Sequence, residues 1–163
     1  MKDGDIINID VTPVLDGFHG DTSRTLFVGN VSKEAKELVE VTERCMYLGI
    51  ETIRPGSFTG DIGAAIFAEA NKYGYGVVQE YAGHGTGRIF HGPPTILHFG
   101  EAGQGVELLS GMAFTVEPML NLGTYRTRLL PDKWTAITAD NKLSAQFEHT
   151  VLVTDDGVDI LTK

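Results

Sequence analysis

Four carboxylates and one histidine stand in sequence contexts that favour burial. Asp10 and Asp21 lie in runs of apolar and β-branched residues, Glu117 lies in AFTVEPML, and Glu148 lies in SAQFEHTVLV. A carboxylate is poorly tolerated in a protein core unless a partner or a metal ion neutralises it. His84 adds a nitrogen donor from the glycine-rich segment EYAGHGTGRIFHGPP. We interpret these five side chains as candidate ligands of a metal centre.

Such a ligand set would suit two divalent ions about 3.5–4 Å apart, which activate water and polarise a carbonyl group. Because oxygen donors predominate, the set favours Mn, Fe or Co over a thiolate-type zinc site, although Zn itself stays open. The competing interpretation is that single acids face solvent and that a lone loop histidine is structural. That interpretation is the weaker one for the five residues taken together.

The glycine-rich segment at residues 80–94 is a poor candidate for phosphate binding. A P-loop requires Lys followed by Ser or Thr after its glycines, and a dinucleotide fingerprint requires G-x-G-x-x-G at the start of a helix. Here GHGTGR leads instead to Pro93 and Pro94. We expect a loop whose glycines let the backbone pass close to another group while His84 and His91 project from it.

A hairpin is predicted to bring the first two carboxylates together. Asp16-Gly17 is a strong turn signal between two strand-like runs, and with that turn the numbers of paired residues sum to 33. Asp10 then lies opposite Ser23 and Thr12 opposite Asp21, so the two aspartates are diagonal neighbours on one face, roughly 7–8 Å apart. A bulge near Pro13 would change this register.

Two helices followed by five strands are predicted along the rest of the chain. A helix is predicted from the N-cap Ser32 to the breaker at residues 54–56, and a second from Ser57 or Thr59 to Gly74. Strands are predicted at 95–99, 112–120, 133–138, 145–154 and 158–162. This order indicates one α+β domain spanning residues 1–163, with an antiparallel sheet and helices on one face.

Composition excludes several functional classes. The net charge of −9 argues against nucleic acid as the main ligand, because phosphate binding requires a cationic surface. The single cysteine, Cys45, excludes an internal disulfide framework. The sequence contains no signal-peptide pattern and no apolar run long enough for a membrane span, so we expect a cytoplasmic protein.

The motifs NIDV, GDTSRT, GHGTGRIFH, FTVEPM and SAQFEHT together resemble type I methionine aminopeptidases, in order and in context. The resemblance implies a pita-bread fold, a curved antiparallel sheet with helices outside and metals inside. It implies that Glu117 is also the general base, and that His91 stabilises the oxyanion beside the scissile carbonyl. Phe90 and Trp134 would be walls of the methionine pocket. The implied metal ligands are Asp10, Asp21, His84, Glu117 and Glu148.

The function implied is hydrolytic removal of N-terminal methionine from peptides or nascent chains whose second residue is small. Two alternatives stay open: a proline-directed aminopeptidase of the same fold, and a non-catalytic module that binds metal or peptide. Ribosome association would require a local basic patch, for which Arg126, Arg128 and Lys133 are the candidates.

Two departures from the family pattern bear on activity. Gly92 stands where an acidic residue is usual after Phe-His, and the usual N-terminal segment does not precede KDGDIINIDV. The second departure implies a shortened enzyme or a fragment, with part of its sheet uncovered. We therefore expect a homodimer or another partner-covered form, and lower activity than a full-length relative has.

Three further histidines have weaker claims on the site. His149 should face the opposite side of its strand from Glu148, which indicates a structural role. His19 shares the face of the aspartates but lies toward the turn. His98 has no partner that the sequence identifies.

Overall fold

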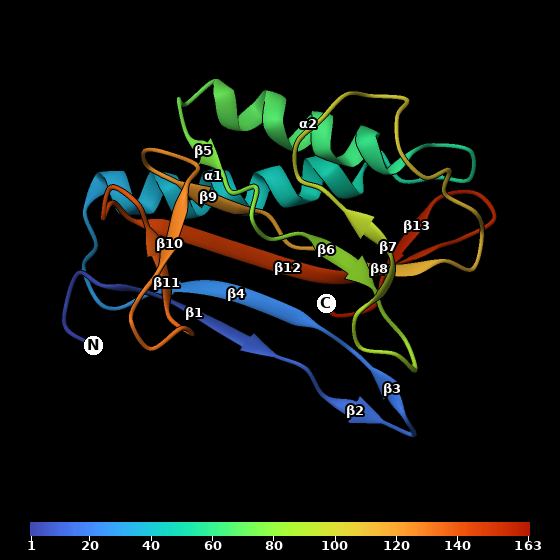
Figure 1. The fold of residues 1–163 in the computed structure, drawn as a ribbon, viewed down its shortest axis with the longest axis horizontal. Helices are drawn as coiled ribbons and strands as arrows, with labels where there is room; N and C mark the ends of the chain where they lie inside the picture. Colours follow the sequence, from blue (N-terminus) through green and yellow to red (C-terminus); the bar gives the residue numbers. More distant parts are fainter.

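The computed structural model describes residues 1–163, and its centre is a nine-stranded antiparallel sheet with two helices on one face (Figure 1). The main strand path runs β1-β4-β12-β8-β6-β7, and β13, β9 and β5 join its sides. The α+β arrangement expected from the sequence is therefore confirmed. The main strands are β1 (Ile6–Val11), β4 (Thr22–Phe27), β12 (Ser144–Val153), β8 (Ala113–Val116), β6 (Gly83–Gly85) and β7 (Gly92–Ile96).

Shorter strands complete the sheet and form two small hairpins. In the sheet, β13 (Val158–Ile160) pairs with β12, and β5 (Gly76–Val77) pairs with β9 (Met119–Asn121). The hairpins are β2 (Val14–Leu15) with β3 (Phe18–His19), and β10 (Thr127–Leu129) with β11 (Ala136–Thr138).

The register of the first hairpin is the predicted one. Asp10 pairs with Ser23 in the β1–β4 ladder, and Leu15 pairs with Phe18 across the turn. In both ladders the numbers of paired residues sum to 33, as predicted. Asp16 and Gly17 both have positive φ, 50° and 78°, as a two-residue hairpin turn requires. No shift of register occurs at Pro13.

Helix α1 (Lys33–Ile50) begins as predicted, with the Ser32 hydroxyl accepting a hydrogen bond from the Ala35 N–H. It ends before the predicted breaker at residues 54–56. Helix α2 (Thr59–Asn71) begins differently from the prediction, because Phe58 is its N-cap residue and the Asp61 carboxylate accepts the Phe58 N–H at 2.7 Å. The two helices pack against each other, and α1 lies against β12.

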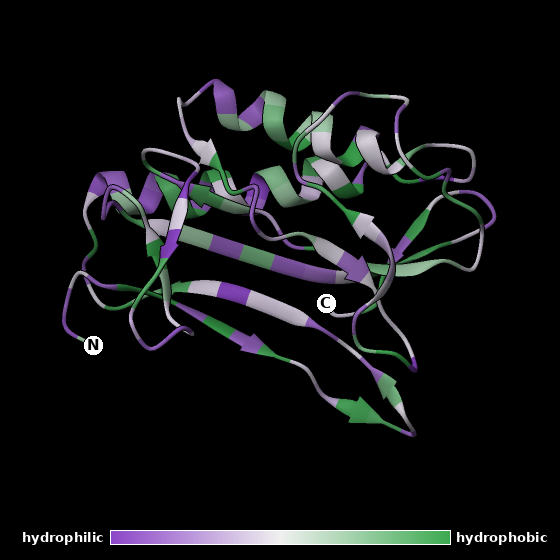
Figure 2. Cartoon of the chain, viewed as in Figure 1, coloured by the Kyte–Doolittle hydropathy of each residue, from purple (hydrophilic) through white to green (hydrophobic).

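The two faces of the sheet differ in polarity, which separates the core from the site. Along β12, Phe147 and Val151 point to the helices and are buried, whereas Glu148 and Thr150 point to the opposite face. Figure 2 shows the resulting alternation of hydrophobic and hydrophilic residues along this strand. The main core thus lies between sheet and helices, and the opposite face is free to carry polar groups.

Two parts of the chain differ from the strand predictions. Residues 83–85 and 92–94 of the expected glycine-rich loop belong to strands β6 and β7, so His84 lies in the sheet. Strand β7 begins three residues before the strand expected at 95–99. The single strand expected at 112–120 is interrupted at Glu117 and Pro118, which separate β8 from β9. Neither helix is long and apolar enough to cross a lipid bilayer.

Candidate metal centre

All five predicted ligands line one cavity of about 220 Å³ on the polar face of the sheet. The strand order explains this, because Asp10 on β1, Asp21 before β4 and Glu148 on β12 come from successive neighbours. Glu117 follows β8, and His84 comes from the adjoining strand β6. Ligand atoms of Asp21, His84 and Glu148 all lie within 4.8 Å of one another. The sheet therefore assembles residues that are far apart in the sequence.

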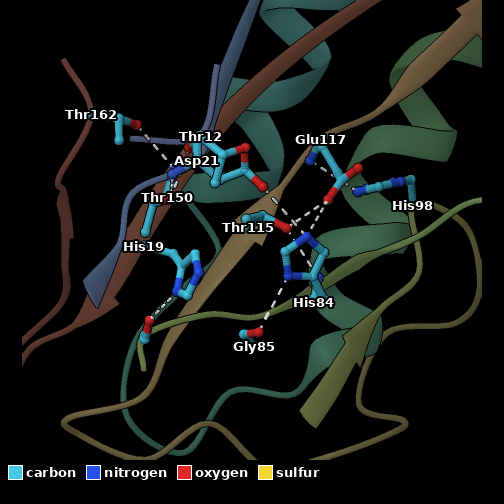
Figure 3. A network of polar contacts seen from close by, with 11 residues as sticks. Thr12, His19, Asp21, His84, Gly85, His98, Thr115, Glu117, Thr150 and Thr162 are labelled. Carbon is cyan, nitrogen blue, oxygen red and sulfur yellow. Dashed lines mark hydrogen bonds and ion pairs between the residues drawn. The ribbon is translucent and has the colours of Figure 1, made fainter. Parts of the chain in front are cut away.

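The orientation of His84 fits a bound cation. Its Nδ1 lies 3.2 Å from the Gly85 carbonyl oxygen, which can only accept, so Nδ1 carries the proton (Figure 3). Burial lowers the pKa of His84, which favours the neutral ring. The Nε2 lone pair then faces a carboxylate oxygen of Asp21 and one of Glu117, each at 3.6 Å. Lone pairs of one nitrogen and two carboxylates that face one another favour a cation between them.

Three carboxylates of the cavity have raised pKa values, because they are buried close to other carboxylates. Burial, followed by repulsion from Glu117, Asp21 and Asp10, raises the pKa of Glu148 to about 9. Burial raises the pKa of Glu117 to about 7, against the opposing hydrogen bond from Thr115. The pKa of Asp10 is raised by burial and by Asp21. Divalent ions would remove these penalties, and the residues present fit such ions.

Threonine hydroxyls hold the ligands in place. Thr115 donates to Glu117 Oε1 at 2.6 Å and accepts the backbone N–H of His84 at 3.0 Å, so one hydroxyl supports two ligands. Thr12 donates to Asp21 Oδ1 at 2.7 Å. On the next strand, the Thr150 hydroxyl accepts the Asp21 N–H at 2.9 Å and donates to the Asp21 carbonyl at 2.8 Å. These hydrogen bonds from threonine hydroxyls fix the orientation of the carboxylates.

His98 supports Glu117, a partner that the sequence did not reveal. The ring is only 2% exposed, and burial lowers its pKa to about 3, so it is neutral. Its Nε2 accepts the Glu117 N–H at 3.1 Å, at the break between β8 and β9 (Figure 3). The structure thus gives His98 a partner that the sequence did not identify. Nothing in the sequence near either residue signals this contact.

Phe90 and His91 reach the cavity, whereas Trp134 does not. Phe90 and His91 are among the lining residues, and the His91 ring centroid lies 4.3 Å from that of His84. The Trp134 side chain is 88% exposed, in the loop between β10 and β11, and it is absent from the cavity wall. A loop tip held by Asp132 hydrogen bonds to the Trp134 and Thr135 N–H groups directs this ring to solvent.

Two other histidines lie outside the cavity. His149 contacts Tyr47 of α1 on the helix side of the sheet, Nε2 to hydroxyl at 3.3 Å, as its place beside Glu148 predicts. His19 stacks on Phe90, with ring centroids 5.3 Å apart, and its Nδ1 lies 2.8 Å from the Gly87 carbonyl oxygen.

A larger cavity of about 480 Å³ adjoins the metal cavity. The two share Tyr81 and Met119 in their walls, and the larger one continues past Val78 and Leu143 to the β10–β11 hairpin. Its partly apolar wall can receive an aliphatic side chain of a molecule bound at the carboxylates.

Comparison with known proteins places this geometry in a family. The sequence matches metallopeptidase family M24 over residues 1–155. The chain belongs to metallopeptidase family M24. The pita-bread fold expected from the motifs is confirmed.

The M24 chain is similar to several methionine aminopeptidases. It is 59% identical to methionine aminopeptidase A of Synechocystis sp. over 162 residues, which cover 99% of this chain and 64% of the relative. It is 55% identical to methionine aminopeptidase of Rickettsia prowazekii, covering 99% of this chain and 63% of that protein. The chain thus spans about three-fifths of the length of these curated relatives.

Solved structures show the same relationship. The crystal structure of the Rickettsia prowazekii methionine aminopeptidase superposes with a TM-score of 0.98 at 54% identity, over 100% of this chain and 66% of that one. Prolidase from Pyrococcus furiosus superposes with a TM-score of 0.77 at 26% identity, over 100% of this M24 chain and 42% of that one. The likeness to the methionine enzymes is therefore the closer of the two.

Proposed function

We propose that residues 1–163 act as one catalytic domain that hydrolyses N-terminal methionine from peptides or nascent proteins with a small second residue. The single observation that carries this proposal is the His84 Nε2 lone pair facing two carboxylates in a cavity that Phe90 and His91 also line. The similarity to two methionine aminopeptidases at 55–59% identity supports the substrate.

Two divalent ions would be held by Asp10, Asp21, His84, Glu117 and Glu148. Bound there, they would polarise the scissile carbonyl and lower the pKa of water. The donor set favours Mn, Fe or Co, and Zn stays open. Metal analysis after purification with each ion identifies the one that supports methionine release.

The protein side chains would supply the proton transfers. Glu117 accepts the proton of the attacking water, a role suited to a carboxylate that lines the cavity beside the other proposed ligands. His91 donates a hydrogen bond to the carbonyl oxygen as negative charge develops on it. The proton then passes to the leaving amine, which departs with the shortened peptide.

The substrate side chain would lie against apolar surface beside the carboxylates. Phe90 forms one wall of the metal cavity, and the adjoining cavity past Met119 has room for an unbranched thioether. Trp134 as a second wall stays a prediction, which would require the loop between β10 and β11 to fold toward the cavity.

The direct test is methionine release from Met-Ala-Ser by the chain purified with Mn²⁺ or Co²⁺. Glu117→Gln keeps the shape of the side chain but removes the base, so we expect at least about a 100-fold loss of kcat. Glu40→Gln, on the exposed face of α1, is the matched control and should retain full activity. Methionine release unaffected by Glu117→Gln would contradict the assignment of the base.

Two rivals give different results in the same assay. A proline-directed aminopeptidase, which the likeness to a prolidase structure favours, would cleave Xaa-Pro in preference to Met-Ala. A binding module would take up metal and peptide without releasing methionine. The substrate preference separates the two peptidases, and the absence of methionine release identifies the binding module.

Partners beyond the substrate are inferred from two surfaces. Ile9, Val11 and Leu26 are 41–49% exposed on the α1 side of the β1–β4 ladder, and we propose that a second copy covers them. A monomer mass in sedimentation at high concentration would exclude that dimer. Ribosome association would use Arg126, Arg128 and Lys133 on or beside the β10–β11 hairpin, and ribosome co-sedimentation tests it. A cytoplasmic location also stays a prediction.

A further inference from the structure

The loop of residues 86–91, between β6 and β7, carries two site residues but has little support from the sheet. Phe90 and His91 face the cavity, whereas Ile89 is 69% exposed and Arg88 is exposed. A loop of this kind orders its functional groups only if another element holds it. The hairpin β2–β3 is that element.

His19 at the end of β3 makes three contacts with this loop. The Gly87 carbonyl oxygen accepts the His19 backbone N–H at 2.9 Å and lies 2.8 Å from His19 Nδ1 (Figure 3). Because a carbonyl oxygen only accepts, Nδ1 must carry the proton. The same ring stacks on Phe90 with an interplanar angle of 16°. One imidazole thus holds the loop by its backbone and by an aromatic side chain.

The contact continues into the site. Phe90 meets the His84 ring edge-on at 5.5 Å between centroids and the His91 ring at 3.8 Å. The preceding hairpin residue, Phe18, adds a second attachment, because the Arg88 guanidinium lies 4.2 Å from the centroid of its ring. The hairpin itself is kept in shape by its tight turn and by the Gly20 N–H donated to the Pro13 carbonyl at 3.0 Å.

We propose that His19 is a positioning residue that holds Phe90 and His91 over the metal centre by bracing the loop 86–91. The inference rests on the proposed function. His19 is not proposed as a ligand, because it does not line the metal cavity. It fixes the positions of His91, the proposed oxyanion donor, and of Phe90, the apolar wall. A displacement of about 1 Å at such groups can cost about 100-fold in rate.

The test compares His19→Ala with His19→Asn in the Mn²⁺-loaded chain. In His19→Ala, amide hydrogen exchange should rise about tenfold at residues 86–91, because the side-chain hydrogen bond to Gly87 and the ring stack on Phe90 are lost. The kcat for Met-Ala-Ser should fall about 10- to 100-fold, with Mn²⁺ affinity unchanged within about twofold. His19→Asn can still donate to Gly87, so it should restore most of the exchange protection and part of the kcat.

Leu15→Ala is the control, since Leu15 is 77% exposed on the same hairpin and touches neither Phe90 nor Gly87. Unchanged exchange at residues 86–91 in His19→Ala would overturn the proposal. A fall in Mn²⁺ affinity parallel to the fall in kcat would also overturn it, by making His19 part of the metal site. If the unmutated chain releases no methionine, the proposed function fails, while the exchange measurement still decides whether His19 braces the loop.

Discussion

His84 is the one nitrogen donor among the five ligand side chains, and its geometry is the most restrictive. Gly85 fixes the proton on Nδ1, so only Nε2 can bind a cation. The Asp21 and Glu117 oxygens lie 3.6 Å from Nε2, and the proposed cation would bind between these atoms. Loss of this ring would leave the proposed cation with the carboxylates alone as ligands.

His84→Ala should therefore weaken Mn²⁺ binding by about 100-fold or more, since loss of an outer-shell partner alone costs about 10- to 100-fold. Isothermal titration of the variant measures this change. His149→Ala, on the helix side of the sheet, should bind Mn²⁺ as the unmutated chain does. Equal affinities for His84→Ala and the unmutated chain would remove His84 from the centre.

At the residue scale, the sequence predicts which side chains carry the chemistry better than it predicts which residues are in contact. Acids in apolar strand contexts pointed to Asp10, Asp21, Glu117 and Glu148, because burial of an unpaired carboxylate is unfavourable wherever it occurs. The support from His98 was not predictable, since its ring reaches a backbone N–H 19 residues away across a strand break. Such a contact depends on the path of the chain.

Helix α2 supports the site through a close backbone approach. A methyl group added at Gly63 would lie 2.5 Å from the Phe99 carbonyl oxygen and 2.7 Å from that of Leu97. These two residues flank His98, which accepts the Glu117 N–H. The small residue at position 63 therefore lets the helix press on the segment that orders Glu117.

Gly63→Ala should lower the free energy of unfolding by about 1–3 kcal/mol, although helix propensity alone would raise it by about 1 kcal/mol. Denaturant unfolding measures the net change in the free energy of unfolding from these two opposing effects. Ala68→Gly, on the exposed side of the same helix, isolates the propensity effect. A Gly63→Ala chain more stable than the unmutated one would show that the contact with residues 97–99 is loose.

At the element scale, local signals with a backbone mechanism were reliable. Asp16-Gly17 fixed the register of two ladders, because both residues adopt the positive φ that the turn needs. The strand β6 escaped prediction, since Gly83 and Gly85 have no side chain to mark a strand. Its pairing with β7 and β8 places it in the sheet.

The whole molecule is a sheet with an apolar face under two helices and an acidic face that needs cations. Without cations, the folded chain binds more protons than the unfolded chain, because the pKa values of Glu117 and Glu148, about 7 and about 9, exceed the ordinary value of 4.5. Stability from these raised pKa values is present at low pH and is lost as pH rises through them.

The melting temperature in EDTA should therefore fall between pH 7 and pH 9. Burial lowers the pKa of His84, His98 and His149, so these three rings are neutral in the folded chain throughout this range. With Mn²⁺ the melting temperature should be higher, and the difference should widen with pH, since ions require deprotonated carboxylates. Parallel curves with and without Mn²⁺ would argue against ions bound at these acids.

At the scale of the fold, the sequence predicted the class but not the strand order. Strands followed by two helices and then by further strands indicated an antiparallel α+β domain, which is what forms. The order β1-β4-β12-β8-β6 depends on long-range pairing that no local pattern records, and it is this order that brings Asp10 and His84 to one cavity.

The most direct test is a crystal structure of the chain grown with Mn²⁺, with anomalous difference density at the manganese absorption edge. We predict two peaks per chain about 3.5–4 Å apart, enclosed by Asp10, Asp21, His84, Glu117 and Glu148. An anomalous map with no peak among these five side chains, at saturating Mn²⁺, would contradict the metal centre.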